Sequence, residues 1–245
     1  MIVLAQLSDI HLDLQGRAEE RAARVMAYLN ELPGDLDAIL ATGDLADHGL
    51  AAEYEQVAKI FSGRHRVLHC PGNHDVREAY REVLLGEPAG DAPINQVHRV
   101  GEATFLMCDS TIPGRDDGYL ADETIDWMDR TLAQDDSAPA FICFHHPPLM
   151  LFSPIVDTIR QTGEDRLARL MRRHPRVVAI LCGHAHTSAA TMFAGRPLLV
   201  APGVVSTGLL PWEAGGPVAL NEPPAVAFHI LDDELRLTTH YRVIV

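Results

Sequence analysis

The chain has 245 residues, of which 47% are hydrophobic and 22% charged, and a formal net charge of -14 at pH 7. This length suits one α/β domain, with two small domains as the alternative, and the apolar content permits a sizeable core. The acidic balance argues against general affinity for nucleic acid or anionic membranes, because both favour basic surfaces. A small anionic substrate remains compatible with it, since bound metal cations can reverse the sign of the local field.

No window approaches the run of about 18 apolar residues that a membrane-spanning helix needs. The segment 1–12 lacks a basic region before its apolar run and reaches Asp9 too early for a signal peptide, so it is interpreted as a strand. The four cysteines lie in separate apolar runs without Cys-x-x-Cys spacing, which indicates buried thiols in a reducing compartment. We therefore expect a cytoplasmic protein.

Strands and helices alternate over the first three quarters of the chain. Apolar runs predict strands at 2–7, 38–41, 66–70, 96–100, 103–108, 140–144 and 177–182. Helical spacing of apolar residues predicts helices over 17–32, around 54–61, over 76–85, around 125–132 and over 163–174. Only strands follow, at 189–194, 197–201, 225–231 and 235–243. The pattern predicts a single layered α/β domain over residues 1–245, with a mixed sheet.

Three connections have no clear period. The segment 86–93 is rich in proline and glycine and is the best candidate for a linker, although strands resume directly after it. Residues 149–161 are predicted to be an irregular rim, and 203–224, which hold many glycines and prolines, to be a loop.

Polar clusters directly follow five of the predicted strands. They are Asp9 with His11, Asp44, Asn73 with His74 and Asp75, His145 with His146, and His184 with His186. Taken singly, each cluster has a plainer interpretation as a polar turn or an exposed histidine pair. Because functional groups in layered α/β folds gather beyond the carboxyl ends of strands, the five together predict one site.

The residue types in these clusters indicate transition-metal ligands. Residues two apart at a strand end, as in Asp9-x-His11, can point the same way and serve one ion. Asp44 has two oxygens able to bridge two cations, Asn73 offers a carbonyl oxygen, and His145 offers a ring nitrogen. Oxygen and nitrogen ligands without sulfur favour Mn, Fe, Co or Zn over Ca²⁺ or a structural zinc.

Charge and spacing together indicate phosphoester chemistry. The positive charge of two divalent cations exceeds the negative charge of Asp9, Asp44 and a bridging hydroxide. The centre would therefore keep a net positive charge that attracts a phosphate anion. Two such ions roughly 3.5–4 Å apart generate hydroxide near neutral pH and stabilise the entering and leaving oxygens. His74 is not needed as a ligand if Asn73 is one, so we expect it to face the substrate as hydrogen-bond donor or general acid. Asp75 is then predicted to orient that imidazole.

The ordered motifs resemble those of the calcineurin-like metallophosphoesterases. The resemblance spans residues 9–186 and rests on Asp9-x-His11, Gly43-Asp44, Gly72-Asn73-His74-Asp75, His145-x-Pro147 and Gly183-His184-x-His186. It implies a four-layer α/β/β/α sandwich with a dinuclear centre, bridged by Asp44 and a hydroxide. One ion would take Asp9, His11, Asp44 and His186, and the other Asp44, Asn73, His145 and His184. His74 matches the catalytic histidine of the family, with Asn73 beside it at the substrate.

A narrower similarity concerns residues 109–114, Gly118, Leu120 and the run 145–148, which look like class III cyclic-nucleotide phosphodiesterases and the related bacterial glycerophosphodiesterases. It implies a phosphodiesterase acting on cAMP or 2′,3′-cyclic nucleotides, with a broad glycerophosphodiesterase or a phosphomonoesterase as alternatives. The acidic balance disfavours a nuclease, and the complete ligand set disfavours a non-catalytic scaffold. Some members of that subgroup dimerise, and the sequence decides neither for nor against a homodimer, nor which metal pair is native.

Overall fold

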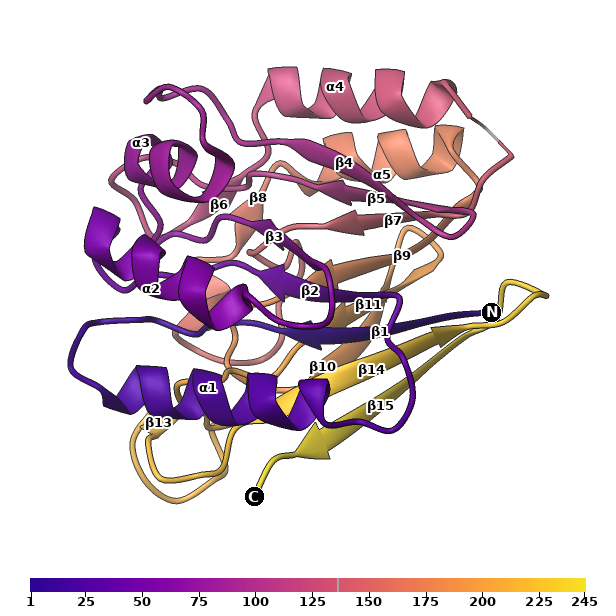
Figure 1. Ribbon diagram of the computed structural model, residues 1–245. Coiled ribbons are helices and arrows are strands. Elements are labelled where there is room, and N and C mark those ends of the chain that lie inside the picture. The colour runs from indigo at the N-terminus through magenta and orange to yellow at the C-terminus, as the bar shows by residue number, and fades with distance from the viewer. Residues whose placement is uncertain (136) are drawn as a thin grey trace.

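Two β-sheets stacked face to face form the centre of the computed structural model, which describes residues 1–135 and 137–245 (Figure 1). The first sheet has the strand order β15 (Leu237–Val243), β14 (Ala225–Leu231), β1 (Ile2–Leu7), β2 (Ala38–Thr42) and β3 (Val67–Cys70). Its β1, β2 and β3 run parallel, whereas β14 and β15 are antiparallel to their neighbours. The first sheet is therefore mixed.

The second sheet is also mixed and has six strands. Their order is β10 (Ala189–Phe193), β11 (Arg196–Val200), β9 (Val177–Cys182), β7 (Ala140–Cys143), β5 (Ala103–Met107) and β4 (Gln96–Val100). The four inner strands are parallel, and the two edge strands, β10 and β4, are antiparallel to their neighbours. Each sheet thus sends the carboxyl ends of its parallel strands to one edge.

Helices cover the outer face of each sheet. Apolar residues of α1 (Arg17–Asn30) and α2 (Ala51–Phe61) pack in one core with the first sheet, and those of α4 (Asp122–Ala133) and α5 (Glu164–Arg173) pack in another with the second. The buried residues of α1 recur at helical spacing, which is why one of its faces can pack on a sheet. These layers confirm the predicted α/β/β/α sandwich with mixed sheets (Figure 1).

The third core lies between the two sheets. Because successive side chains of a strand point to opposite faces, Leu40 enters this core while its neighbours Ile39 and Ala41 pack toward the helices. Phe105 and Phe141 stack here with ring centroids 4.8 Å apart. All four cysteines are free and buried, and burial raises the pKa of each thiol, as expected for packing residues.

The irregular segments are more ordered than their sequence indicates. The predicted helix over 76–85 is a short α3 (Arg77–Tyr80) followed by a π-helix, Arg81–Leu85. The segment 149–161 contains a 3-10 turn, η2 (Val156–Thr158), and leads into β8 (Gln161–Thr162), which pairs with β6 (Gly118–Tyr119). Residues 203–224 contain a small hairpin of β12 (Thr207–Gly208) and β13 (Val218–Ala219). Two-residue strands have no sequence period, so only their partners reveal them.

Among the described residues, the helices are all too short or too polar to cross a membrane.

We predict that the buried imidazole of His229 makes stability fall in mild acid. His229 lies in β14, bonded to Gln6 and Thr239, and burial lowers its pKa from 6.5 to about 3. Between pH 6.5 and pH 3, His229 is protonated in the unfolded chain but stays neutral in the native protein. The free energy of unfolding therefore decreases as the pH falls from 6.5 toward 3. At pH 5 the loss is about 2 kcal/mol.

Urea unfolding at pH 7 and pH 5 measures this loss. His229→Gln should unfold at lower urea at pH 7 but lose less stability between the two pH values than the unsubstituted protein. His240→Gln removes an exposed imidazole from the neighbouring β15 and serves as the matched control. Equal pH dependence in all three proteins would contradict the assignment.

Candidate metal centre

The predicted ligands meet where the parallel strands of both sheets end. Three of the five clusters follow β1, β2 and β3 of the first sheet, and two follow β7 and β9 of the second. Their nitrogen and carboxylate atoms form sets in which every ligand atom lies within 4.8 Å of the others. The sets that contain predicted ligands alone are Asp9 with His11 and His186, and Asp9 with Asp44 and His145.

A left-handed backbone conformation accompanies these ligands. Nine non-glycine residues of the described chain have positive φ, and five of them are predicted ligands: Asp9, His11, Asp44, His184 and His186. Such conformations cost free energy for residues with a side chain and cluster at functional sites, where the surrounding structure enforces them. The sharp turns that keep these side chains at the sheet edge therefore lower the stability of the fold.

The first predicted ligand set is close-packed around two carboxylates. Asp9 Oδ1 lies 3.4 Å from His186 Nε2, and Asp44 Oδ2 lies 3.4 Å from His11 Nε2. The rings of His11 and His186 have centroids 5.2 Å apart. Asp9, His11 and His186 thus offer ligand atoms within 4.8 Å of one another, and Asp44 adjoins them at His11, a mixture of oxygen and nitrogen donors that suits a transition-metal ion.

The second predicted set shares Asp44 with the first. Asp44 Oδ2 lies 3.2 Å from His145 Nε2, and the same nitrogen lies 3.2 Å from His184 Nδ1. Asn73, which follows β3, lines the same cleft. Because one oxygen of Asp44 is near both His11 and His145, its position is the one that a bridging carboxylate needs.

Hydrogen bonds at the far side of three imidazoles direct Nε2 toward the centre. Nδ1 is bonded to the Asp47 carboxylate at 2.9 Å in His11, to the Thr42 carbonyl at 2.7 Å in His145, and to the Ser206 hydroxyl at 2.7 Å in His186. Such partners fix the tautomer and the ring orientation of a metal-ligating histidine.

Three buried polar atoms of the site test whether it suits a metal. Within the described residues, His11 Nε2, Asn73 Oδ1 and His184 Nε2 are buried without any hydrogen-bond partner. Buried polar atoms are rarely left unpaired in native proteins, so each calls for an explanation. All three atoms belong to predicted ligand residues. A cation in the first set would satisfy His11 Nε2 and one in the second would satisfy Asn73 Oδ1, while His184 turns its Nδ1 toward the second set. The residues present therefore fit transition-metal ions.

Electrostatics at the centre also call for positive charge. Burial by itself would raise the pKa of Asp44, but His145 and His11 hold it well below its usual range. Burial would likewise lower the pKa of His145, yet Asp44 and Asp9 raise it to about 9. A buried carboxylate without a cationic partner is costly, and bound metal cations would supply positive charge to Asp44.

His74 lies beside His11 and Asp44, with which it forms a set of atoms within 4.8 Å of one another, but it is more exposed than they are. Its backbone N–H donates to Asp44 Oδ1 at 2.9 Å, but its side chain is 40% exposed and lines the cleft. Its Nδ1 is bonded to the Asp47 carbonyl at 2.8 Å, and its ring meets that of His11 edge-on at 4.5 Å between centroids. Asp47 therefore orients both His74 and His11.

The role predicted for Asp75, orienting His74, is corrected by this geometry. The buried Asp75 carboxylate accepts hydrogen bonds from the N–H groups of Gly72, Leu45 and Ala46 at 2.8–3.2 Å, and from the Tyr54 hydroxyl at 3.1 Å. Burial, with the charge of Asp44, nevertheless raises the pKa of Asp75 to about 6. Its carboxylate therefore joins the turn after β3 to the turn after β2 and holds the ligand backbones together.

The histidine beside His145 is satisfied within the protein. His146 is fully buried, with Nδ1 bonded to Ser110 Oγ at 2.8 Å and Nε2 to the Asp116 carbonyl at 3.2 Å. Burial holds the pKa of His146 well below its usual range, which favours the neutral form of the ring. It anchors the polar loop 109–118 beneath the site, a role that the sequence did not assign.

Sequence reasoning missed two partners of the ligands. Asp47 follows Asp44 by three residues in the same turn, and a second carboxylate so near a predicted ligand was a signal that could have been used. Ser206 lies in the segment 203–224, where serine among glycines and prolines is ordinary loop composition. Its bond to His186 was therefore invisible before the fold was known.

Glycines allow the ligand turns to approach one another. A Cβ on Gly72 would lie 2.2 Å from Asp44 Oδ1, and one on Gly43, at φ 92°, would lie 2.4 Å from His145 Nδ1. Both distances are far below any tolerated contact. The glycine before each of Asp44 and Asn73 is thus a requirement for close approach as well as for a turn.

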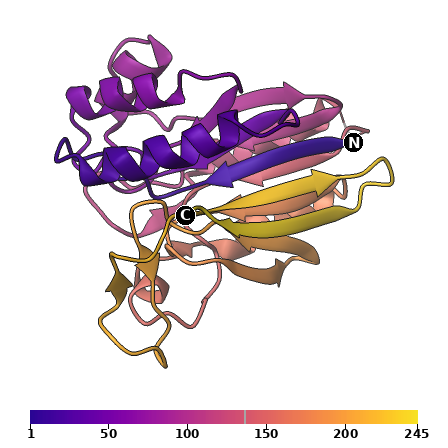
Figure 2. The same ribbon diagram turned by 60° about the horizontal axis from the view of Figure 1, so that its bottom comes forward.

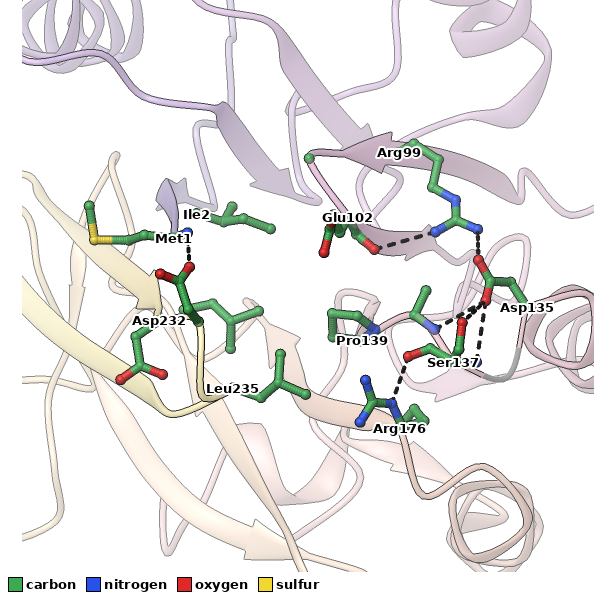
Figure 3. Close-up of a pocket in the computed structure, with 14 residues that line it drawn as sticks. Met1, Ile2, Arg99, Glu102, Asp135, Ser137, Pro139, Arg176, Asp232 and Leu235 are labelled. Atoms are coloured by element: carbon green, nitrogen blue, oxygen red, sulfur yellow. Dashed lines mark hydrogen bonds and ion pairs between the residues drawn. The ribbon is translucent and has the colours of Figure 1, made fainter.

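A small cleft of about 180 Å³ opens directly onto the ligands. A much larger groove, about 1010 Å³, lies at the opposite ends of the strands (Figure 3). Charged groups in that groove are already engaged with each other, such as Arg99 with Asp135 and the N-terminal ammonium group with Asp233. The small cleft is lined by five predicted ligands, His11, Asp44, Asn73, His184 and His186, whereas a neighbouring cavity of about 260 Å³ is lined by Asn73 alone among them.

Family comparison agrees with this centre. Residues 2–188 match the model of the calcineurin-like phosphoesterase family. The chain belongs to that family. It is accordingly a metal-dependent phosphoesterase, and the buried clusters of aspartate and histidine correspond to a dimetal site of the kind typical of this family.

Two relatives and one solved structure show how widely the likeness extends. The "Probable cyclic nucleotide phosphodiesterase" of Rhodococcus erythropolis is 34% identical over 226 residues, covering 87% of this chain and 74% of the relative. A glycerophosphodiester phosphodiesterase of Enterobacter lignolyticus is 30% identical over 240 residues, covering 93% and 86%. The crystal structure of a dimetal phosphatase from Danio rerio has a TM-score of 0.74 at 14% identity, over 100% of this chain and 96% of that one. That structure shares the fold.

We predict that Gly72→Ala weakens metal binding without unfolding the protein. The added methyl group would push Asp44 away from its place between His11 and His145, and disturbed support of a ligand costs roughly 10–100-fold in metal affinity. Gly34→Ala, whose Cβ meets nothing within 4 Å, is the matched control. Metal content after dialysis against buffered Mn²⁺ or Zn²⁺ measures the effect, and equal metal content in both variants would contradict it.

Proposed function

We propose that this protein hydrolyses small phosphodiesters with two transition-metal ions, and that cyclic nucleotides such as 3′,5′-cAMP or 2′,3′-cyclic nucleotides are its substrates. The observation that carries the proposal is the position of Asp44. Its Oδ2 lies between His11 and His145, at the floor of a narrow cleft that His74 also lines. The floor suits a phosphate group, and the cleft leaves room for one small substituent.

The residues that would hold the ions follow from the two ligand sets. One ion would bind Asp9, His11, Asp44 and His186, and the other Asp44, Asn73, His145 and His184. Divalent ions bound there would supply Lewis acidity, which polarises a phosphoryl group and lowers the pKa of water. The mixed oxygen and nitrogen donors favour Fe, Mn, Zn or Co.

His74 is proposed as the general acid. The bond from its Nδ1 to the Asp47 carbonyl fixes the ring and leaves Nε2 as the nitrogen available in the cleft. A protonated His74 would donate from Nε2 to the leaving oxygen of the diester, which otherwise departs as an unstable alkoxide. Asn73, beside it, would contribute its carbonyl oxygen to the metal and its amide N–H to a phosphoryl oxygen.

The size of the cleft and the charge of the chain favour small substrates. A net charge of -14 opposes the long, polyanionic backbone of a nucleic acid. The two reported relatives carry names for cyclic-nucleotide and glycerophosphodiester hydrolysis. A glycerophosphodiester is therefore the second candidate substrate, and a phosphomonoester the third.

A panel of phosphoesters tests the proposed activity. Metal-loaded protein should hydrolyse bis(p-nitrophenyl) phosphate faster than p-nitrophenyl phosphate, because a diester presents a single negative charge to the centre and an ester oxygen to His74. Among natural substrates we expect 3′,5′-cAMP or a 2′,3′-cyclic nucleotide to exceed sn-glycero-3-phosphoethanolamine in kcat/KM. Faster turnover of the monoester than of every diester would refute the proposed class of reaction.

Two substitutions separate metal binding from proton transfer. Asp44→Ala should lose metal at both positions, since one carboxylate serves both ligand sets. His74→Ala should retain its metal content and lose roughly 10²–10⁴-fold in kcat, the usual range for a general acid. Elemental analysis and steady-state rates on the same samples give both readouts. Metal loss in His74→Ala would instead make His74 a ligand.

A further inference from the structure

Two segments without sequence periodicity build one wall of the cleft. The segment that contains η2 contributes three aliphatic residues and one serine, and the hairpin of β12 and β13 contributes Pro217 and Val218. The four residues of the first segment are Ser153, Ile155, Val156 and Ile159. Both segments project from the same end of the sandwich, beyond the edges of the sheets (Figure 2). The cleft therefore has a polar floor of metal ligands and an aliphatic wall.

The wall exposes apolar surface that a ligand can cover. Ile155 is 53% exposed and Val218 is 45% exposed, although both line a cleft. Burial of apolar area is worth about 25 cal/mol per Å², so a flat apolar group placed against these side chains would be bound favourably. A polar group such as glycerol, placed against Ile155 and Val218, would instead give up hydrogen bonds to water without a partner on these two side chains.

Hydrogen bonds hold both segments in place before any ligand arrives. Arg17 and Arg21 of α1 donate to the carbonyls of Val205 and Val204 at 2.9 and 2.7 Å, and the Gly208 N–H donates to the His186 carbonyl at 2.9 Å. The Gly208 bond ties the hairpin to the ligand turn after β9, and the two arginine bonds tie the residues before the hairpin to α1. A wall that is already ordered avoids the free-energy cost of ordering it on binding.

A bond within the other segment has the same effect. The Asp157 carboxylate accepts a hydrogen bond from the Leu151 N–H at 2.6 Å and closes the turn that presents Ile155. The Gln161 N–H donates to the Pro147 carbonyl at 3.1 Å and joins the end of the segment to the residues after β7. Both sources of the wall are thus fixed relative to the metal ligands.

We propose that Ile155 and Val218 hold the nucleobase of the substrate and so select cyclic nucleotides over glycerophosphodiesters. This inference rests on the proposed phosphodiesterase function, because the phosphate must lie on the metal ligands for the base to reach the wall. Ile155 and Val218 line the same cleft as His11, Asp44 and His186, so a group attached to a phosphate on the ligands meets these two side chains.

Serine substitutions in the wall test the proposal. In Val218→Ser and Ile155→Ser, kcat/KM for 3′,5′-cAMP should fall about tenfold through a higher KM, the scale of small changes in an apolar pocket. For sn-glycero-3-phosphoethanolamine, kcat/KM should stay unchanged. Leu220→Ser, which removes an apolar side chain 57% exposed in the same hairpin region but outside the cleft, is the matched control. Metal content should be the same in all variants.

Equal losses on both substrates, or no loss on cAMP, would overturn the role of the wall. If the unsubstituted protein hydrolyses no diester, the proposed function fails, and calorimetric binding to the metal-loaded protein decides the inference separately. AMP should then bind more tightly than glycerol 3-phosphate, and the wall variants should weaken AMP about tenfold while leaving glycerol 3-phosphate unaffected. Equal weakening of the two ligands would overturn the inference even in that case.

Discussion

Two buried carboxylates, Asp9 and Asp44, are the constraint on which the rest of the molecule depends. Both are at most 2% exposed, and a negative charge removed from water needs a compensating positive charge nearby. The fold supplies imidazoles from both sheets around them, and the remaining demand for positive charge suits metal ions. The α/β/β/α arrangement is the means by which strand ends far apart in the sequence reach one place.

The close approach of these ligands has a structural cost. Five predicted ligands adopt left-handed backbone conformations, and Gly72 leaves space where any side chain would collide with Asp44. Three separate hydrophobic cores, one between the sheets and one beneath each helical layer, stabilise the structure that enforces this strain. The stability of the sandwich and the precision of the site are therefore linked.

The cleft combines parts of different origin. Its floor consists of residues at the ends of regular strands. Its wall comes from the η2 segment and the β12–β13 hairpin, neither of which is part of the two main sheets. A floor of this kind can bind the phosphate of any phosphoester. A change in the wall alters only which substituent can be bound beside that phosphate. This division explains how one fold can serve several substrates, since function depends on the site and not on the fold alone.

The sequence by itself determined the alternation of strands and helices, the strand ends and the candidate ligands, because apolar runs that end in aspartate, asparagine or histidine are local patterns. The four-layer sandwich was implied by the resemblance of the motifs to a known family and not by these patterns. Only the tertiary structure decided which group supports which ligand. Asp47, not Asp75, orients His74, and Ser206 contacts His186 across 20 residues of chain. The apolar wall also appeared only in the folded protein. Each of these contacts depends on the distance between turns that are remote in sequence, and such distances leave no periodic signal.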